Sequence, residues 1–191
     1  MTIKAAFWPM SGGAVREPFD PNQVLIERTG AFTYSALLPA GIYDLIIAGG
    51  GGNGLASNVM GVIFYNKGGS GAAWEGQFYN PVEQQITLYA GGLQQDSYMD
   101  LGGVRVITAG RGGDHKGGST GHGGDGGIIS VGSLQIIQQR LSANGNGGAR
   151  GVNSYTPTPA VCSFNNWGQG GSNGLEYAVA GGIRLQYIKI E

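Results

Sequence analysis

The stretch Gly117-Gly118-Ser119-Thr120-Gly121-His122-Gly123-Gly124-Asp125-Gly126-Gly127 decides how the rest of this chain is interpreted. Glycine stands at positions 118, 121, 124 and 127, which is a period of three residues. Three residues per turn is the period of a polyproline-II helix, and close packing of such helices requires a glycine at every third position. An α-helix repeats at about 3.6 residues and a strand at about two, so neither fits. The stretch therefore predicts one rod in a lattice of glycine-rich helices.

The composition favours a folded protein with a structural or recognition role. Of the 191 residues, 39 are glycine and only 7 are proline, and glycine does not keep its period throughout, which excludes collagen. A hydrophobic content of 41% argues against a flexible linker. The net charge of −1 provides no basic surface for nucleic acid, and no apolar run approaches the ~20 residues of a membrane helix. We expect neither a nucleic-acid partner nor membrane insertion.

Two parts of the chain differ in composition. Residues 1–22 contain three prolines and form a lead-in or attachment segment, whereas residues 23–191 form one β plus polyglycine-helix domain. Two alternatives stay open for Phe7, Trp8 and Phe19, which either pack on the core of this protein or dock it onto a larger assembly. No secretory signal peptide is expected, because the apolar run after Lys4 is too short.

Apolar runs and turn residues predict a mainly β fold with little α structure. Thr29-Gly30 between two strands is typical of a hairpin. Ile128–Leu141 is ambiguous: Ser133 is a candidate cap for a short helix, but its first residues favour a strand. The other expected strands are residues 23–28, 31–36, 42–48, 72–79, 84–90, 104–109 and 183–190.

Glycine runs alternate with strands and with four irregular inserts, at residues 55–67, 93–101, 114–116 and 152–167. If each run leaves the strand region and the next run returns to it, all four inserts emerge as distal loops at one end. Polyproline-II helices have no internal hydrogen bonds, so buried rods must pair with one another, and only glycine allows that approach. The glycines to which we assign this structural role are Gly118, Gly121, Gly124, Gly127, Gly148 and Gly171.

The chain resembles a known family in three places. A strand, a Pro-Ala-Gly turn, a second strand and a glycine run occur in Leu38-Pro39-Ala40-Gly41-Ile42-Tyr43-Asp44-Leu45-Ile46-Ile47-Ala48-Gly49-Gly50-Gly51-Gly52. The stretches beginning Gly71-Ala72-Ala73-Trp74-Glu75-Gly76 and Gly181-Gly182-Ile183-Arg184-Leu185-Gln186-Tyr187 extend the likeness over roughly residues 30–191. This order is similar to glycine-rich domains of phage tail-fibre tips, such as the adhesins of T-even-like phages. The resemblance implies a sandwich of polyglycine helices whose distal loops bind the bacterial surface.

Aromatic, amide and basic residues gather in the inserts and are the candidate receptor contacts. Such side chains give large contact area and adaptable hydrogen bonding, and loops on a rigid scaffold often carry function. Phe64 and Phe164 have two alternatives, since either can fold inward as a local core. Strand aromatics, among them Trp74 and Tyr187, are assigned to the core. The candidate contacts are Phe64, Tyr65, Lys67, Tyr98, His115, Lys116, Asn153, Tyr155, Asn165, Asn166 and Trp167.

No catalytic constellation or cofactor site is predicted. Gly49, Gly51 and Gly54 match the dinucleotide-binding fingerprint, but the glycine-rich residues that follow do not favour the helix that this motif must open. His115, His122, Asp114 and Asp125 have no standard metal-site spacing, and a single calcium-type repeat is too few. Cys162 is the only cysteine and has no nearby base in the sequence. We expect neither an enzyme nor a metal site.

These observations predict a receptor-binding protein at the tip of a phage tail fibre, extracellular when it functions. Its expected partners are a bacterial outer-membrane protein or surface glycan and other tail-fibre or virion proteins. The alternative is a purely structural role without receptor binding, either as a virion decoration or as a subunit of a bacterial surface filament. The sequence names neither the receptor nor the oligomeric state.

Overall fold

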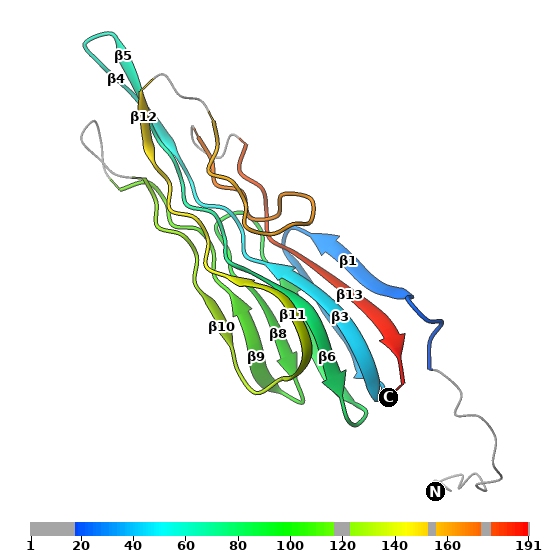
Figure 1. Cartoon of the computed structure of the whole chain (residues 1–191). Coiled ribbons are helices and arrows are strands. Elements are labelled where there is room, and N and C mark those ends of the chain that lie inside the picture. Colours follow the sequence, from blue (N-terminus) through cyan, green and yellow to red (C-terminus); the bar gives the residue numbers. More distant parts are fainter. Residues whose placement is uncertain (1–17, 117–122, 153–155, 173–176, 191) are drawn as a thin grey trace, which may run out of the picture.

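The computed structural model describes residues 18–116, 123–152, 156–172 and 177–190, so the lead-in residues Phe7 and Trp8 lie outside the described part (Figure 1). The described residues contain strands and no helix, which confirms the expected mainly β fold. The strands are β1 (Val24–Thr29), β2 (Phe32–Leu38), β3 (Gly41–Ala48), β4 (Leu55–Val59), β5 (Val62–Asn66), β6 (Ala73–Asn80), β7 (Gln84–Ala90), β8 (Ser97–Leu101), β9 (Val104–Ala109), β10 (Ile129–Val131), β11 (Gln135–Ala143), β12 (Arg150–Val152) and β13 (Gly182–Lys189).

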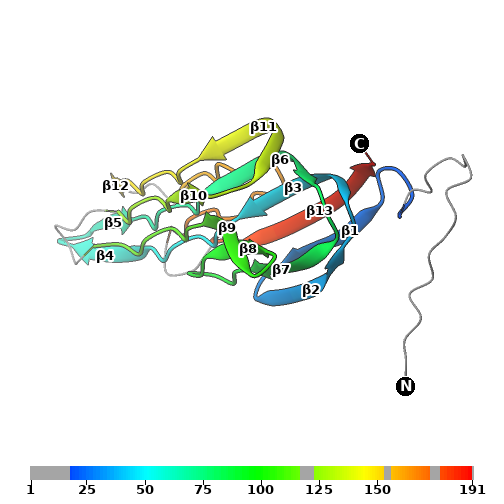
Figure 2. The same cartoon turned by 90° about the horizontal axis from the view of Figure 1, so that it is seen from below.

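Two antiparallel five-stranded sheets form the body of the molecule. Sheet A has the order β1-β13-β3-β6-β11, and sheet B has the order β10-β9-β8-β7-β2. Alternate side chains of both sheets meet in one core, in which Tyr43, Trp74 and Tyr187 of sheet A are fully buried beside Leu88 and Ile107 of sheet B. The two sheets therefore make a sandwich (Figure 2).

A second, smaller core covers the other face of sheet A. Strand β3 is buried along its whole length, because Ile46 and Ala48 point away from the first core. Cys162 and Trp167 pack on these residues, with Phe164 against them. Burial of both faces explains why β3 is a continuous apolar run rather than an alternating one.

Three expectations about the strands need correction or completion. The hairpin expected at Thr29-Gly30 is wrong, because β1 pairs with β13 in sheet A whereas β2 pairs with β7 in sheet B. The segment Ile128–Leu141 contains strands β10 and β11, not a helix capped by Ser133. The insert at 93–101 ends in β8, which pairs with β7 and β9 inside sheet B, so this insert is not an irregular loop at the far end.

Phe19 packs against the first core, with the centres of its ring and that of Tyr187 5.5 Å apart in an edge-to-face arrangement. This contact supports the first of the two alternatives for that side chain. The charged pair Asp44–Arg140 bridges β3 to the edge strand β11. The edge strand β11 is thus held to sheet A by this ion pair as well as by its backbone hydrogen bonds with β6.

Between the sheets and the far end of the molecule, glycine-rich segments run side by side (Figure 1). We define the glycine-rich region as residues 49–54, 67–72, 110–115, 123–128, 144–149 and 168–172. Segment 67–72 lies at its centre and exchanges backbone hydrogen bonds with all five others. A strand in a sheet has at most two neighbours in its plane, so this arrangement is not a sheet.

The direction of the backbone donors in the central segment repeats every three residues. The N–H groups of residues 67 and 70 donate to segment 144–149, those of residues 68 and 71 to segment 168–172, and those of residues 69 and 72 to segment 110–115. Along each partner segment the accepting residue moves back by three, for instance from Gly113 to Gly110. In a strand the direction would instead alternate every two residues.

These segments approach so closely that side chains do not fit between them. A Cβ built on Gly124, Gly127 or Gly148 would lie 1.9 to 2.0 Å from a backbone carbonyl oxygen of a neighbouring segment. Gly171 also bonds across, donating to Gly52 O at 2.9 Å. Gly118 and Gly121, assigned the same role from the sequence, lie outside the described residues.

Candidate recognition surface

A three-stranded sheet of order β12-β5-β4 lies at the end of the molecule farthest from the C-terminus (Figure 1). We call it the tip sheet. Strands β4 and β5 form a hairpin whose turn is Met60-Gly61, and both turn residues have positive φ angles of 51° and 84°. Such a turn matches the twist of the two strands that it joins, and Asn58 Oδ1 fixes it by accepting from Gly61 N at 3.0 Å. Residues 55–67, expected to be irregular, are therefore largely a hairpin.

The outer half of this hairpin exposes apolar side chains. Met60 is 100% exposed, and Val62 and Ile63 are 38% and 39% exposed. They belong to neither of the two hydrophobic cores. An exposed apolar group at the end of a rigid support is a common feature of a protein-binding or ligand-binding surface.

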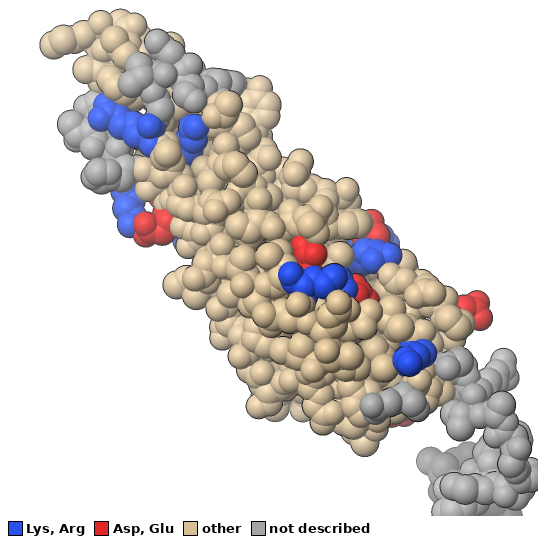
Figure 3. Space-filling model, viewed as in Figure 1, with Lys and Arg blue, Asp and Glu red and all other residues tan. Residues whose placement is uncertain are grey.

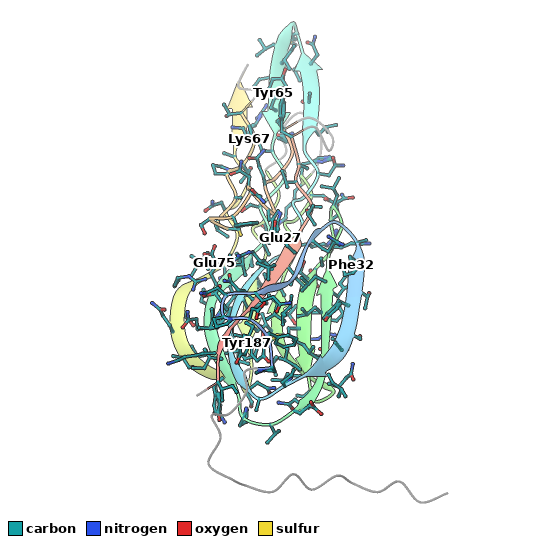
Figure 4. All side chains as sticks on the ribbon, turned by 90° about the vertical axis from the view of Figure 1, so that its right-hand side faces the viewer. Glu27, Phe32, Tyr65, Lys67, Glu75 and Tyr187 are labelled. Carbon is teal, nitrogen blue, oxygen red and sulfur yellow. The ribbon has the colours of Figure 1, made fainter. Side chains whose placement is uncertain are left out.

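The inner half carries aromatic and basic side chains in fixed positions. The guanidinium carbon of Arg150 lies 4.0 Å from the ring centre of Phe64, which is a cation–π contact. Lys67 Nζ donates to Thr156 Oγ1 at 2.9 Å, which connects the hairpin to the segment after β12. Tyr65 is half-buried and faces Ala56 and Gly151 in the register of the sheet. Tyr65 and Lys67 lie in the narrow part of the molecule, whereas Phe32 and Tyr187 lie in the broad part (Figure 4).

On the face shown in Figure 3, several basic side chains lie toward the same end, whereas the sandwich carries both basic and acidic side chains. Lys116 forms an ion pair with Asp125, and its neighbour His115 donates its backbone N–H to Asn53 O at 2.9 Å. No acidic residue occurs in the described strands of the tip sheet. The described part of this end is therefore mildly basic and partly apolar.

Several predicted contact residues lie elsewhere. Tyr98 is in β8, where its ring stacks on Tyr89, so it is not part of a distal loop. Trp167 is only 3% exposed and packs in the second core with its ring 4.9 Å from Phe164, so its assignment as a surface contact is wrong. Asn165 and Asn166 are exposed, but they lie on the turn that covers sheet A.

The remaining two candidates, Asn153 and Tyr155, fall outside the described residues. The sequence interpretation missed Met60, Val62 and Ile63 because it gave weight to aromatic and amide groups. The signal was present, since a Met-Gly pair between two apolar-rich runs is compatible with a two-residue hairpin turn.

The glycines that match the dinucleotide fingerprint lead into strand β4, not into a helix, so the structural context of that motif is absent. Burial raises the pKa of the Cys162 thiol to about 12, and a hydrogen bond with Glu75 acts in the same direction. That thiol is thus protonated at neutral pH and unsuited to attack a substrate. Within the described ranges, no group of three or more histidine, cysteine or acidic residues could hold a metal ion.

A search with models of known protein families found none that matches this chain. A comparison with curated protein sequences also found no match. Among the residues that the structure describes, no helix has the length and hydrophobicity needed to cross a membrane.

Proposed function

We propose that this chain is a non-enzymatic receptor-binding domain at the tip of a phage tail fibre, which recognises a bacterial surface structure through its tip sheet. Its receptor is an outer-membrane protein or a surface glycan, and other tail-fibre or virion proteins hold it in the particle. The domain acts outside the host cell. The observation that carries the proposal is a hairpin with exposed apolar side chains at the end of a region that glycine keeps tightly packed.

The glycine-rich region is, in this proposal, a lattice of polyproline-II-type helices. A helix with three residues per turn presents its N–H groups in three directions, and the donors of residues 67–72 repeat with that period. Each rod must lack side chains toward its neighbours, which fits the 1.8 Å distance from a Cβ at Gly69 to Asp125 O. Such a lattice would hold the tip sheet away from the sandwich with little freedom to bend.

Recognition by the tip sheet follows from how its side chains are supported. Two strands and a tight turn hold the backbone at Met60 and Ile63, so little backbone conformational entropy is lost there on binding. Phe64 is fixed by Arg150 and Lys67 by Thr156, which provides an amphipathic base beside the apolar tip. Apolar, aromatic and basic groups in one place suit a loop of an outer-membrane protein or an acidic glycan.

The structural alternative rests on a different observation. Strand β11 is an edge of sheet A, and Ile136 and Ile137 on it are 41% and 49% exposed. An exposed apolar edge strand can pair with another chain, as a filament subunit would require. In that case the tip sheet would have no receptor, and assembly would depend on β11.

Binding of the fluorescently labelled chain to intact cells of a panel of bacterial strains separates the two functions. The test variant carries Val62→Ser and Ile63→Ser on the tip sheet. The matched control carries Leu37→Ser and Val82→Ser, because these side chains are also exposed (62% and 59%) but belong to β2 and to the turn after β6. We expect the tip variant to lose binding at least tenfold while the control binds as the parent does.

Two results would reject the proposal. The first is equal binding by the tip variant and the parent to a strain that the parent recognises. The second is an absence of binding to every strain, together with concentration-dependent self-association that Ile137→Lys abolishes. The second outcome would establish the filament alternative.

A further inference from the structure

A shallow pocket of about 400 Å³ opens on sheet B, where that sheet meets the glycine-rich region. It is lined by Tyr89, Tyr98, Arg105 and Arg111 and by the turn at residues 94–96. Strands β7, β8 and β9, which provide the first three side chains, are neighbours in the sheet (Figure 2). None of these residues belongs to the tip sheet.

Flat groups stand side by side along one wall of this pocket. The rings of Tyr89 and Tyr98 are stacked with their centres 5.0 Å apart and their planes 27° from parallel. The guanidinium carbon of Arg105 lies 3.4 Å from the ring centre of Tyr98, and Asp100 holds the same arginine through an ion pair. The wall is therefore formed by two tyrosines and one arginine in fixed positions.

The glycine-rich region holds the opposite wall in place. Gly50 N donates to Gln95 O at 2.9 Å, and Gln94 N donates to Gly51 O at 3.1 Å. The side chain of Asp96 accepts from Arg111 N at 2.7 Å. Because backbone groups fix the turn from both sides, the pocket exists before a ligand arrives, and binding loses little entropy.

The polar groups of the pocket comprise both donors and acceptors. The guanidinium of Arg111 donates through Nη1 to Gln94 O at 3.2 Å, and its other N–H groups have no acceptor among the described residues. Gln95 and Asp96 are exposed; the Gln95 amide oxygen already accepts from Tyr89 Oη at 2.8 Å and from Gly92 N at 3.0 Å, and Asp96 adds a carboxylate. A ligand that fits must both donate and accept at several points.

We propose that this pocket binds a single neutral hexose unit of a glycan. Each sugar hydroxyl is both donor and acceptor, so adjacent hydroxyls can satisfy Arg111 and Asp96 together. The apolar C–H face of the sugar ring packs against the tyrosine side chains of this wall, which are apolar bodies with polar ends. The carboxylates of Asp96, in the lining, and of Asp100, paired with Arg105, offset the charges of Arg105 and Arg111, so the site has no net positive charge to attract a phosphate group. The volume lies within the range of small-molecule sites.

This site is independent of the tip sheet, so each can fail without the other. The experiment titrates the full, ¹⁵N-labelled chain with glucose, galactose, N-acetylglucosamine and inorganic phosphate, and follows the amide signals of residues 94–96 and Arg111. We expect saturable shifts of these signals with at least one of the three sugars and none with phosphate. Signal shifts with phosphate alone, or the absence of shifts with all three sugars, would overturn the proposal.

Arg111→Met tests the assignment of the guanidinium, and the backbone bond from residue 111 to Asp96 remains in this variant. Arg28→Met is the matched control, because Arg28 is likewise an exposed arginine but lies over the ring of Phe32, outside the pocket. We expect Arg111→Met to weaken sugar binding about tenfold, which is the usual effect of losing a hydrogen bond to a charged group. Unchanged binding by Arg111→Met, or equal loss in Val62→Ser/Ile63→Ser, would contradict this location.

Discussion

Gly69→Ala is the most direct perturbation of the glycine-rich region. A Cβ at position 69 would lie 1.8 Å from Asp125 O, and an ordinary contact begins at about 3.4 Å. The two backbones must therefore separate by about 1.6 Å. Gly69 has no positive φ, so the substitution introduces a steric conflict without backbone strain at the residue itself.

The free-energy change follows from the hydrogen bonds that such a displacement breaks. The two segments that must separate are joined by Gly124 N, which donates to Lys67 O at 2.8 Å, and by Gly127 N, which donates to Ser70 O at 2.9 Å. Counting one buried backbone group left unpaired for each broken bond, at about 1–3 kcal/mol per group, the two broken bonds cost about 2–6 kcal/mol. Alanine offsets only about 0.4–1 kcal/mol by restricting the unfolded chain. This loss is a large part of the ~5–15 kcal/mol that stabilises a typical domain.

Urea unfolding followed by tryptophan fluorescence measures the effect, because Trp74 and Trp167 are buried. Gly147→Ala is the matched control: it lies in the same region, has no positive φ, and its Cβ would be 3.9 Å from the nearest atom, Gly124 O. We expect the control to unfold within about 0.5 kcal/mol of the parent and Gly69→Ala to lose several times that. Equal urea midpoints for the two variants would refute the close-packing argument.

Three further predictions concern charged and titratable groups. Arg140→Met leaves the nearly buried carboxylate of Asp44 without its partner and should lower the free energy of unfolding by about 1–3 kcal/mol. Adding Asp44→Asn to the same chain should restore part of the lost free energy. No recovery in urea unfolding would contradict this prediction. Burial raises the pKa of Asp114. Hydrogen bonds from Asn53 and Gln94 and the nearby charge of Arg111 together lower this pKa by more than burial raises it, so the net pKa is below 3.8. The ionised Asp114 carboxylate therefore stabilises the fold above the pKa of the unfolded chain, and this stabilisation is lost as the pH falls through the lower folded pKa. Asp114→Asn should make the free energy of unfolding depend less on pH below about pH 4. An unchanged pH dependence in that range would argue against this prediction. Cys162, whose pKa is raised to about 12, should resist a thiol reagent at pH 8 until the chain unfolds, and rapid labelling of the folded chain would disagree with its burial.

Much of the sandwich was predictable because local signals determine it. The apolar runs of β3, β6, β7, β9 and β13 coincide with the strands expected from the sequence to within a residue or two. Strand pairing was not predictable, because the partners are far apart in the chain. Thr29-Gly30 has the composition of a hairpin turn, yet β1 and β2 belong to different sheets, and β1 pairs with β13, some 150 residues away.

The errors about side-chain exposure have one physical origin. Trp167 was assigned to the surface because it lies in an insert whose aromatic and amide groups suit recognition, but Ile46 and Ala48 on the outer face of sheet A pack against it. The unbroken apolar run of β3 was the available signal, because a strand with one solvated face would alternate. A large aromatic in a later insert is then the natural cover for that face.

The hairpin leaves and re-enters the glycine-rich region through adjacent segments, so the support at its base does not depend on the side chains of the hairpin. Segments 49–54 and 67–72 are joined to each other by Gly52 N to Gly69 O at 2.9 Å and by Gly49 N to Ala72 O at 3.0 Å. These bonds involve backbone atoms alone, so they fix the spacing at the base of the hairpin whatever side chains occupy residues 55–66. In the proposed function, a substitution at Ile63 would change what is recognised without a cost in the support, whereas a substitution at Gly69 would change the support whatever is recognised. Stability and recognition therefore depend on separate sets of residues in the proposed adhesin.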